Sequence, residues 1–205
     1  MKATYSAVVF DLYTALLDSW TLWNRVAGSE ETGLAWRTRY LALSYRAGSY
    51  RPYEGIIEEA AGLVGIPAGR TGELIRLWGE LEPWPEARRV VSGLLEKVPV
   101  GVATNSSILL AETAVASLGV PLSLVVTAEE AGFYKPRPQP YLMAVERLGC
   151  EPASVLFVAG SAVDVPGASA VGMPVFWHNR RHLRPVDGVR PRYVSDSLEP
   201  LLDLV

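Results

Sequence analysis

The sequence is poor in the two residue types that most often form cross-links or hold transition metals. Its 205 residues include one cysteine, Cys150, and two histidines, His178 and His182. A single cysteine excludes a disulfide framework and a thiolate metal cluster, and two histidines are too few for a metal site built from histidines. We expect Cys150 to pack at a helix end and both histidines to lie on the surface.

An excess of positive charge and a long apolar segment are also lacking. The 19 basic and 22 acidic residues give a net charge of −3, which argues against nucleic acid as the main partner because phosphate binding needs a basic face. No run of about 18 apolar residues is present, so no membrane-spanning segment is expected. The first residues lack the apolar segment of a signal peptide, and the expected location is cytoplasmic.

Short valine-rich runs alternate with helical patterns in the second part of the chain. The expected strands cover residues 7–10, 98–103, 122–126, 155–158 and 174–177, and the expected helices cover 87–97, 108–118, 138–148 and 165–171. Apolar strands without polar alternation are typical of a parallel sheet covered on both faces. The sequence therefore predicts an α/β fold with a doubly wound, Rossmann-like parallel sheet.

The region between the first two strands has a different pattern. From residue 19 to about 78, apolar residues recur at helical spacing and are interrupted by glycine and proline. We expect an α/β core domain at 1–15 and 86–205, with an inserted helical cap domain at 16–85. Leu34, Leu41 and Tyr45 would give one cap helix an apolar face suited to a homodimer.

Polar residues follow the expected strands at the point where each strand ends. Asp11 follows the first, Thr104 and Asn105 the second, Lys135 the third and Asp164 the fourth. Taken singly, Asp11, Thr104 and Asp164 could be helix caps, and Lys135 a solvated loop residue. Together they favour a ligand site, because ligands bind at the carboxyl ends of the strands in such sheets. A lysine among carboxylates keeps them ionised, and an ionised, partly desolvated Asp11 is a competent nucleophile.

The segments around these residues resemble the haloacid dehalogenase superfamily, and most closely its L-2-haloacid dehalogenase branch, over essentially the whole chain. The matching segments are Phe10-Asp11-Leu12-Tyr13, Lys135-Pro136 with Tyr141 beyond it, Phe157-Val158 with Asp164 beyond it, and Trp36-Arg37 in the cap. The resemblance implies a hydrolase that removes halide from short 2-haloalkanoic acids through an aspartyl ester and releases 2-hydroxy acids. The implied partner is a small anionic substrate, and no metal or other cofactor is expected.

The resemblance also implies roles for individual residues. Asp11 would be the nucleophile, with Lys135, Ser161 and Asp164 orienting it and the hydrolytic water. The residues expected to bind or hold substrate are Leu12 and Tyr13 through their amides, Arg37 and Asn105 at the halide, Thr104 at the carboxylate, and Tyr141 behind Lys135.

A Mg²⁺-dependent small-molecule phosphatase of the same superfamily is the alternative. Phosphatases of the superfamily carry an acid two residues after the nucleophile to protonate a poor leaving group, whereas this chain has Tyr13 there. Gly160 stands where phosphatases place a further aspartate that helps retain Mg²⁺. Halide leaves as a stable anion, so neither change should harm dehalogenation. We expect Tyr13→Asp with Gly160→Asp to raise phosphatase activity.

Two segments depart from the dehalogenase branch. The turn after the nucleophile is Thr14-Ala15 instead of Gly-Thr, and the fourth motif is Ala159-Gly160-Ser161 instead of Ser-Ser-Asn. Losing a positioned donor can cost roughly 10²-fold in rate. The departures leave three alternatives open: a slow dehalogenase, one with a shifted substrate, and a non-catalytic relative.

Overall fold

Six parallel strands form one sheet in the computed structural model, which describes residues 5–186 and 188–205. The strand order is β3-β2-β1-β4-β5-β6. The strands are β1 (Ala7–Phe10), β2 (Val100–Thr104), β3 (Leu124–Thr127), β4 (Val155–Ala159), β5 (Val175–His178) and β6 (Tyr193–Ser195). The order reverses at β1, so β1 and its neighbours β2 and β4 form the switch point at which a doubly wound sheet binds ligands.

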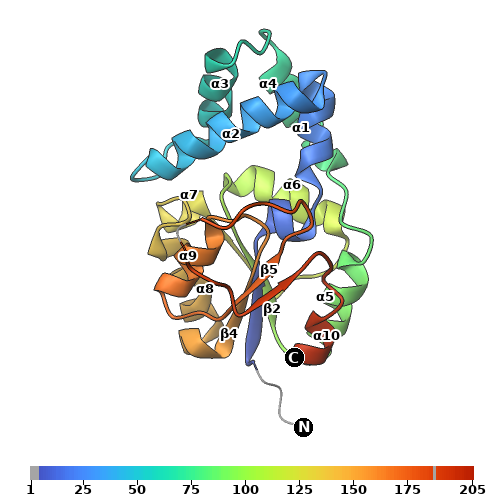
Figure 1. The fold of residues 1–205 in the computed structure, drawn as a ribbon, viewed down its shortest axis with the longest axis vertical. Coiled ribbons are helices and arrows are strands. Elements are labelled where there is room, and N and C mark those ends of the chain that lie inside the picture. The colour runs from blue at the N-terminus through green and yellow to red at the C-terminus, as the bar shows by residue number, and fades with distance from the viewer. Residues whose placement is uncertain (1–4, 187) are drawn as a thin grey trace.

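Helices cover both faces of the sheet, as the valine-rich strands predict (Figure 1). One face carries α5 (Ala87–Leu95), α6 (Ile108–Leu118) and α10 (Leu201–Leu204), and the other carries α8 (Pro138–Leu148) and α9 (Asp164–Ala170), with the short α7 (Ala128–Ala131) beside α8. Within β1, Val8 and Phe10 pack on the first face, and Ala7 and Val9 pack on the second. Burial on both sides is why the strand has no polar position before Asp11.

Four helices between β1 and α5 form a layer beyond the carboxyl ends of the strands, at the top of Figure 1. They are α1 (Ser19–Ala27), α2 (Glu30–Arg46), α3 (Tyr53–Leu63) and α4 (Arg70–Arg76), followed by the 3₁₀ turn η2 (Trp78–Glu80). The two chain segments that enter and leave this layer are paired: Leu17 bridges Pro83, and the Trp84 amide donates to the Leu16 carbonyl over 2.9 Å. This pairing fixes where the helical layer stands over the sheet.

The expected α/β fold is confirmed, with several additions. The structure adds the edge strand β6, the helices α7 and α10, the 3₁₀ turn η3 (Pro152–Ser154) and the π-helical turn η1 (Leu12–Leu16) directly after Asp11. The prediction that His178 lies on the surface is wrong. It ends β5 in the interior, where its Nδ1 lies 3.0 Å from the Ala15 carbonyl oxygen. His182 is exposed as expected. Among the described residues, no helix has the length and apolarity needed to cross a membrane.

Candidate active site

A small cavity of about 40 Å³ lies where the helical layer meets the carboxyl ends of the strands. The core contributes Asp11, directly after β1, Lys135, in the loop between α7 and α8, and Asp164, the first residue of α9. The helical layer contributes Arg37 and a set of aromatic side chains. A space of this size holds roughly three water molecules. The site therefore suits a small molecule.

Asp11 lies in this cavity with both carboxylate oxygens already hydrogen-bonded. Its Oδ1 accepts from Lys135 Nζ over 2.8 Å, and its Oδ2 accepts from the backbone amide of Thr14 over 2.9 Å and from the Thr14 hydroxyl. Burial alone would raise the pKa of Asp11, but the attraction of Lys135 and these hydrogen bonds outweigh it and hold that pKa below its usual value. Asp11 is a buried carboxylate that stays ionised. It also caps η1, so the cap interpretation of this residue is correct as well.

Lys135 is fully enclosed between two carboxylates. Its Nζ lies 2.8 Å from Asp11 Oδ1 and 3.1 Å from Asp164 Oδ2, and Tyr141 donates to the other oxygen of Asp164 over 2.7 Å. Burial lowers the pKa of Lys135, but the two carboxylates more than compensate and raise it. Burial raises the pKa of Asp164, and Lys135 offsets this only in part. The interpretation of Lys135 as a solvated loop residue is therefore wrong.

Arg37 is a buried cation that forms no ion pair with any carboxylate of the described residues. Its Nη1 donates to Ser19 Oγ over 2.7 Å, its guanidinium carbon lies 4.1 Å from the centre of the Trp20 ring, and its Nε has no partner among the described residues. Burial lowers its pKa, although nearby groups oppose this. A desolvated guanidinium with free donors facing a cavity is arranged to receive an anion.

Tyr13 forms part of an aromatic wall beside Asp11. Its ring stacks on Tyr53, with ring centres 6.4 Å apart, and meets Trp78 edge to face at 5.2 Å. Its hydroxyl lies 2.6 Å from Ser106 Oγ and accepts from Trp78 Nε1 over 3.3 Å. Burial raises the pKa of this phenol far above its usual value. Tyr13 is therefore a poor proton donor, unlike a carboxylic acid at the same position.

A protein-family model described as haloacid dehalogenase-like hydrolase matches residues 5–172. The chain belongs to this family. (S)-2-haloacid dehalogenase 2 of Pseudomonas sp. (strain CBS-3) is 30% identical over an alignment that covers 97% of this chain and 94% of that protein. (S)-2-haloacid dehalogenase of Xanthobacter autotrophicus is 29% identical, over 82% of this chain and 73% of its own. A crystal structure of a dehalogenase superposes with a TM-score of 0.88 at 26% identity, covering 98% of this chain and 97% of that one. The family expected from the sequence motifs is confirmed.

Within this haloacid dehalogenase-like fold, Thr14 and Gly160 pack directly against each other. A Cβ atom added at Gly160 would stand 2.3 Å from the Thr14 carbonyl carbon and 2.4 Å from the Ala15 nitrogen. No side chain fits there without moving the backbone of η1. The expectation that Gly160→Asp would help build a phosphatase site is therefore wrong. Thr14 stands where the dehalogenase branch has a glycine. Its side chain occupies the space that is free because Gly160 has no side chain, and its hydroxyl donates to Asp11.

The structure brings most of the predicted site residues to the cavity wall, but not all of them. Asp11, Tyr13, Arg37, Asn105, Lys135, Ser161 and Asp164 line it. Leu12, Thr104 and Tyr141 are buried outside the lining, and the Thr104 hydroxyl has no partner among the described residues. The cap of α6 is Ser107, so Thr104 does not cap that helix.

Asn105 is placed differently from the expectation. Its Oδ1 accepts from the Lys135 amide over 2.7 Å, and its Nδ2 donates to the Lys135 carbonyl over 3.0 Å. These two bonds clamp the backbone that carries the lysine and leave one amide hydrogen free. Sequence reasoning missed Thr14, whose role depends on the missing side chain at Gly160. It also missed Tyr45, whose hydroxyl lies 3.4 Å from Ser161 Oγ across the boundary between α2 and the core.

Proposed function

We propose that this protein is a hydrolytic dehalogenase of short 2-haloalkanoic acids, with Asp11 as nucleophile. The observation that carries the proposal is that two buried charged groups line one small cavity. One is the ionised carboxylate of Asp11, and the other is the guanidinium of Arg37, which forms no ion pair with a carboxylate of the described residues. The relatives named (S)-2-haloacid dehalogenase support it. In-line displacement puts the leaving halide opposite the nucleophile, which is where a cation is most useful.

The hydrogen bonds at Asp11 indicate which oxygen attacks. A carboxylate oxygen has two lone pairs in its plane. Both donors of Thr14 reach Oδ2, whereas Oδ1 accepts only from Lys135. Oδ1 thus keeps a free lone pair and forms the bond to C2 of the substrate, as the bond from C2 to halogen breaks and halide leaves with its electrons.

The same arrangement serves the second step. Once Oδ1 is esterified, Oδ2 is the carbonyl oxygen of the ester, and it gains negative charge when water attacks Cγ. The amide and hydroxyl of Thr14 already point at this atom, so they act as an oxyanion hole. Asp164 lines the cavity and its pKa is raised, which makes it the better base for the proton of the attacking water. The bond between Cγ and Oδ1 then breaks, and Oδ1 leaves with C2 as the hydroxyl oxygen of the 2-hydroxy acid, taking up the proton that Asp164 received from the water. The bond between Oδ1 and C2 stays intact, and the oxygen of the water remains in the carboxylate of Asp11.

The phosphatase alternative is less well supported by the same side chains. Tyr13 cannot supply the proton that an alkoxide leaving group needs. The described residues hold no group of three acidic, histidine or cysteine side chains in a metal-binding arrangement, and Gly160 has no room for a further carboxylate. We therefore propose that the reaction requires no metal ion.

Parallel assays on 2-chloropropionate, chloroacetate and an aryl phosphate test the assignment. We expect halide release that EDTA does not diminish, and no comparable phosphate release with Mg²⁺. Efficient Mg²⁺-dependent phosphate release without halide release would show that the phosphatase alternative is correct.

Thr14→Val should slow hydrolysis of the ester more than its formation. The substitution keeps the shape of the side chain but removes the hydroxyl donor to Asp11 Oδ2, and loss of one such donor costs about 10²-fold in rate. Mass spectrometry of the variant during turnover should detect an accumulated alkyl adduct on the protein. Thr14→Ser, which retains the hydroxyl, should restore turnover; an equal loss in both variants would contradict the assigned role.

Arg37→Lys should lower kcat/KM for 2-chloropropionate by about 10²-fold, because a lysine cannot reproduce the planar fork of donors. Arg39→Lys is the matched control, since Arg39 is exposed two residues further along α2. Steady-state halide release measures both. Unchanged turnover by Arg37→Lys with chloro and bromo substrates would exclude a halide role for Arg37.

A further inference from the structure

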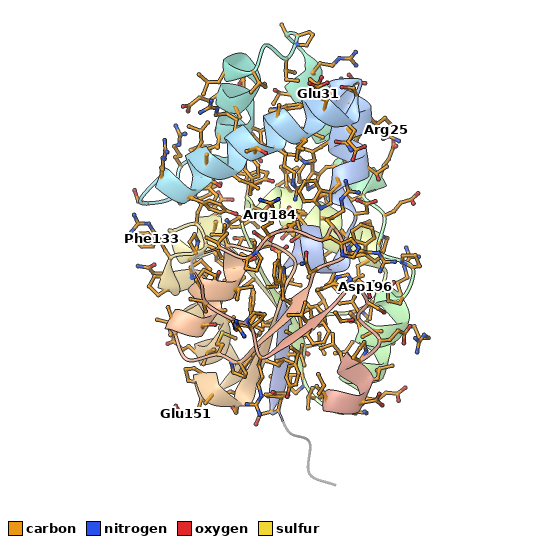
Figure 2. All side chains as sticks on the ribbon, viewed as in Figure 1. Arg25, Glu31, Phe133, Glu151, Arg184 and Asp196 are labelled. Atoms are coloured by element: carbon orange, nitrogen blue, oxygen red, sulfur yellow. The ribbon has the colours of Figure 1, made fainter. Side chains whose placement is uncertain are left out.

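A second pocket lies next to the reaction cavity, at the seam between α2 and the core. It measures about 410 Å³, roughly ten times the volume of the reaction cavity. Its walls are mostly apolar, with Leu34 and Ala42 from α2 and Ala162, Val163 and Leu183 from the core. We call it the seam pocket. Figure 2 shows Arg184, which also lines it, below α2 at this seam.

The seam pocket and the reaction cavity share one wall. Leu41, Tyr45 and Ser161 line both spaces. The polar contact across this wall is the one between the Tyr45 hydroxyl and Ser161 Oγ, and its 3.4 Å length is at the weak end for a hydrogen bond between hydroxyls. A substrate in the reaction cavity is therefore separated from the seam pocket by the side chains of Tyr45 and Ser161, which are joined only by this weak hydrogen bond.

The other walls of the reaction cavity are charged or polar on two sides and aromatic on a third. Arg37 closes the side of the leaving halide, and Lys135 and Asn105 form a polar side suited to the substrate carboxylate. The aromatic wall is fixed by the short contact between Tyr13 and Ser106. C2 of a 2-haloacid carries a halogen, a carboxylate, a hydrogen and a carbon chain. The larger apolar space adjoins the cavity at Leu41, Tyr45 and Ser161, and this is the direction in which a longer chain finds room.

We propose that the seam pocket binds the alkyl or aryl chain of the substrate, so that the preferred substrates are 2-haloacids longer than three carbons. This inference rests on the proposed dehalogenase function and assigns its substrate class. Each methylene moved from water into an apolar pocket gains about fourfold in binding. Three added methylenes should therefore raise kcat/KM by about 60-fold.

The test compares 2-bromopropionate with 2-bromohexanoate in the parent enzyme and in variants that fill the seam pocket. We expect the ratio of kcat/KM, long to short, to be about 60 in the parent and to fall to about one in Ala42→Phe. Thr38→Phe, at an exposed position on the same wall, obstructs the pocket independently and should lower the ratio in the same direction. Ala35→Phe is the control, because Ala35 is exposed on α2 and outside the lining. It should keep the parent ratio.

The outcomes separate this inference from the proposed function. Turnover of the short acid with a parent ratio of one or less overturns the chain subsite and leaves the dehalogenase function intact. Absence of turnover with every 2-haloacid overturns both. A change of oligomeric state in Ala42→Phe by light scattering, with the ratio unchanged, would show that the seam pocket is an interface between two copies of the chain.

Discussion

Asp11→Asn is expected to lose at least about 10⁴-fold in kcat, the largest effect of any single substitution in this protein. An amide oxygen is a far weaker nucleophile than a carboxylate. The substitution keeps the size of the side chain, and an amide oxygen can still accept the Thr14 amide bond that caps η1. The fold should therefore survive, and the loss should appear in chemistry.

Halide release in a burst experiment tests the predicted loss in kcat, and a thermal melt tests whether the fold is retained. Asp203→Asn is the matched control, since Asp203 is exposed on α10 at the far end of the core. Retention of more than a few per cent of parent activity by Asp11→Asn, with deamidation excluded by mass spectrometry, would contradict the assignment of the nucleophile.

Lys135→Met is expected to impair both activity and stability. The substitution leaves Asp11 and Asp164 buried without their common cation, and removing one partner of a buried pair costs about 3 kcal/mol or more in unfolding free energy. It also removes the charge that keeps Asp11 ionised, so turnover at neutral pH should fall by at least about 10²-fold. Lys97→Met, at an exposed lysine that contacts the Leu202 carbonyl, is the control.

The stability loss should depend on pH with a definite sign. In the parent, the pKa of Asp11 is lowered below its ordinary value of 3.8, so its stabilising contribution is present above that pH and is lost as pH falls through the lowered pKa. Without Lys135, burial raises the pKa of Asp11 and Asp164, and the variant loses stability as pH rises and these groups ionise. Urea unfolding should show a deficit that is larger at pH 7 than at pH 4. A deficit that grows toward acid pH would contradict this account.

The course of the chain was largely predictable because it follows from local patterns. The strands that precede Asp11 and Asp164, β1 and β4, are continuous apolar runs. The helices α6 and α8 begin and end at the residues that their spacing indicates. The positions of Asp11, Lys135 and Asp164 could be predicted because parallel strands bring their carboxyl ends to one edge. The edge strand β6 was not predictable in this way, since its three residues lie among turn-forming residues.

The finer parts of the site depend on contacts between segments distant in sequence. Thr14 supplies a hydroxyl to Asp11 only because Gly160 has no side chain. Asn105 clamps Lys135 across a separation of 30 residues, and no local pattern distinguishes that role from halide binding. The interior position of His178 depends on Ala15. These features require the packed structure, and they change how the departures from the family pattern are interpreted.

A single turnover in H₂¹⁸O, with enzyme in excess over 2-chloropropionate, tests the central claim most directly. If Oδ1 of Asp11 forms the ester and water attacks Cγ, the first product molecule carries an unlabelled hydroxyl, and the label appears in the peptide that contains Asp11. Peptide mass spectrometry after proteolysis locates the label, and the Thr14→Val variant should retain the unhydrolysed adduct on the same peptide. Label in the first product molecule, with none in the Asp11 peptide, would show that water displaces the halide directly and would contradict the account.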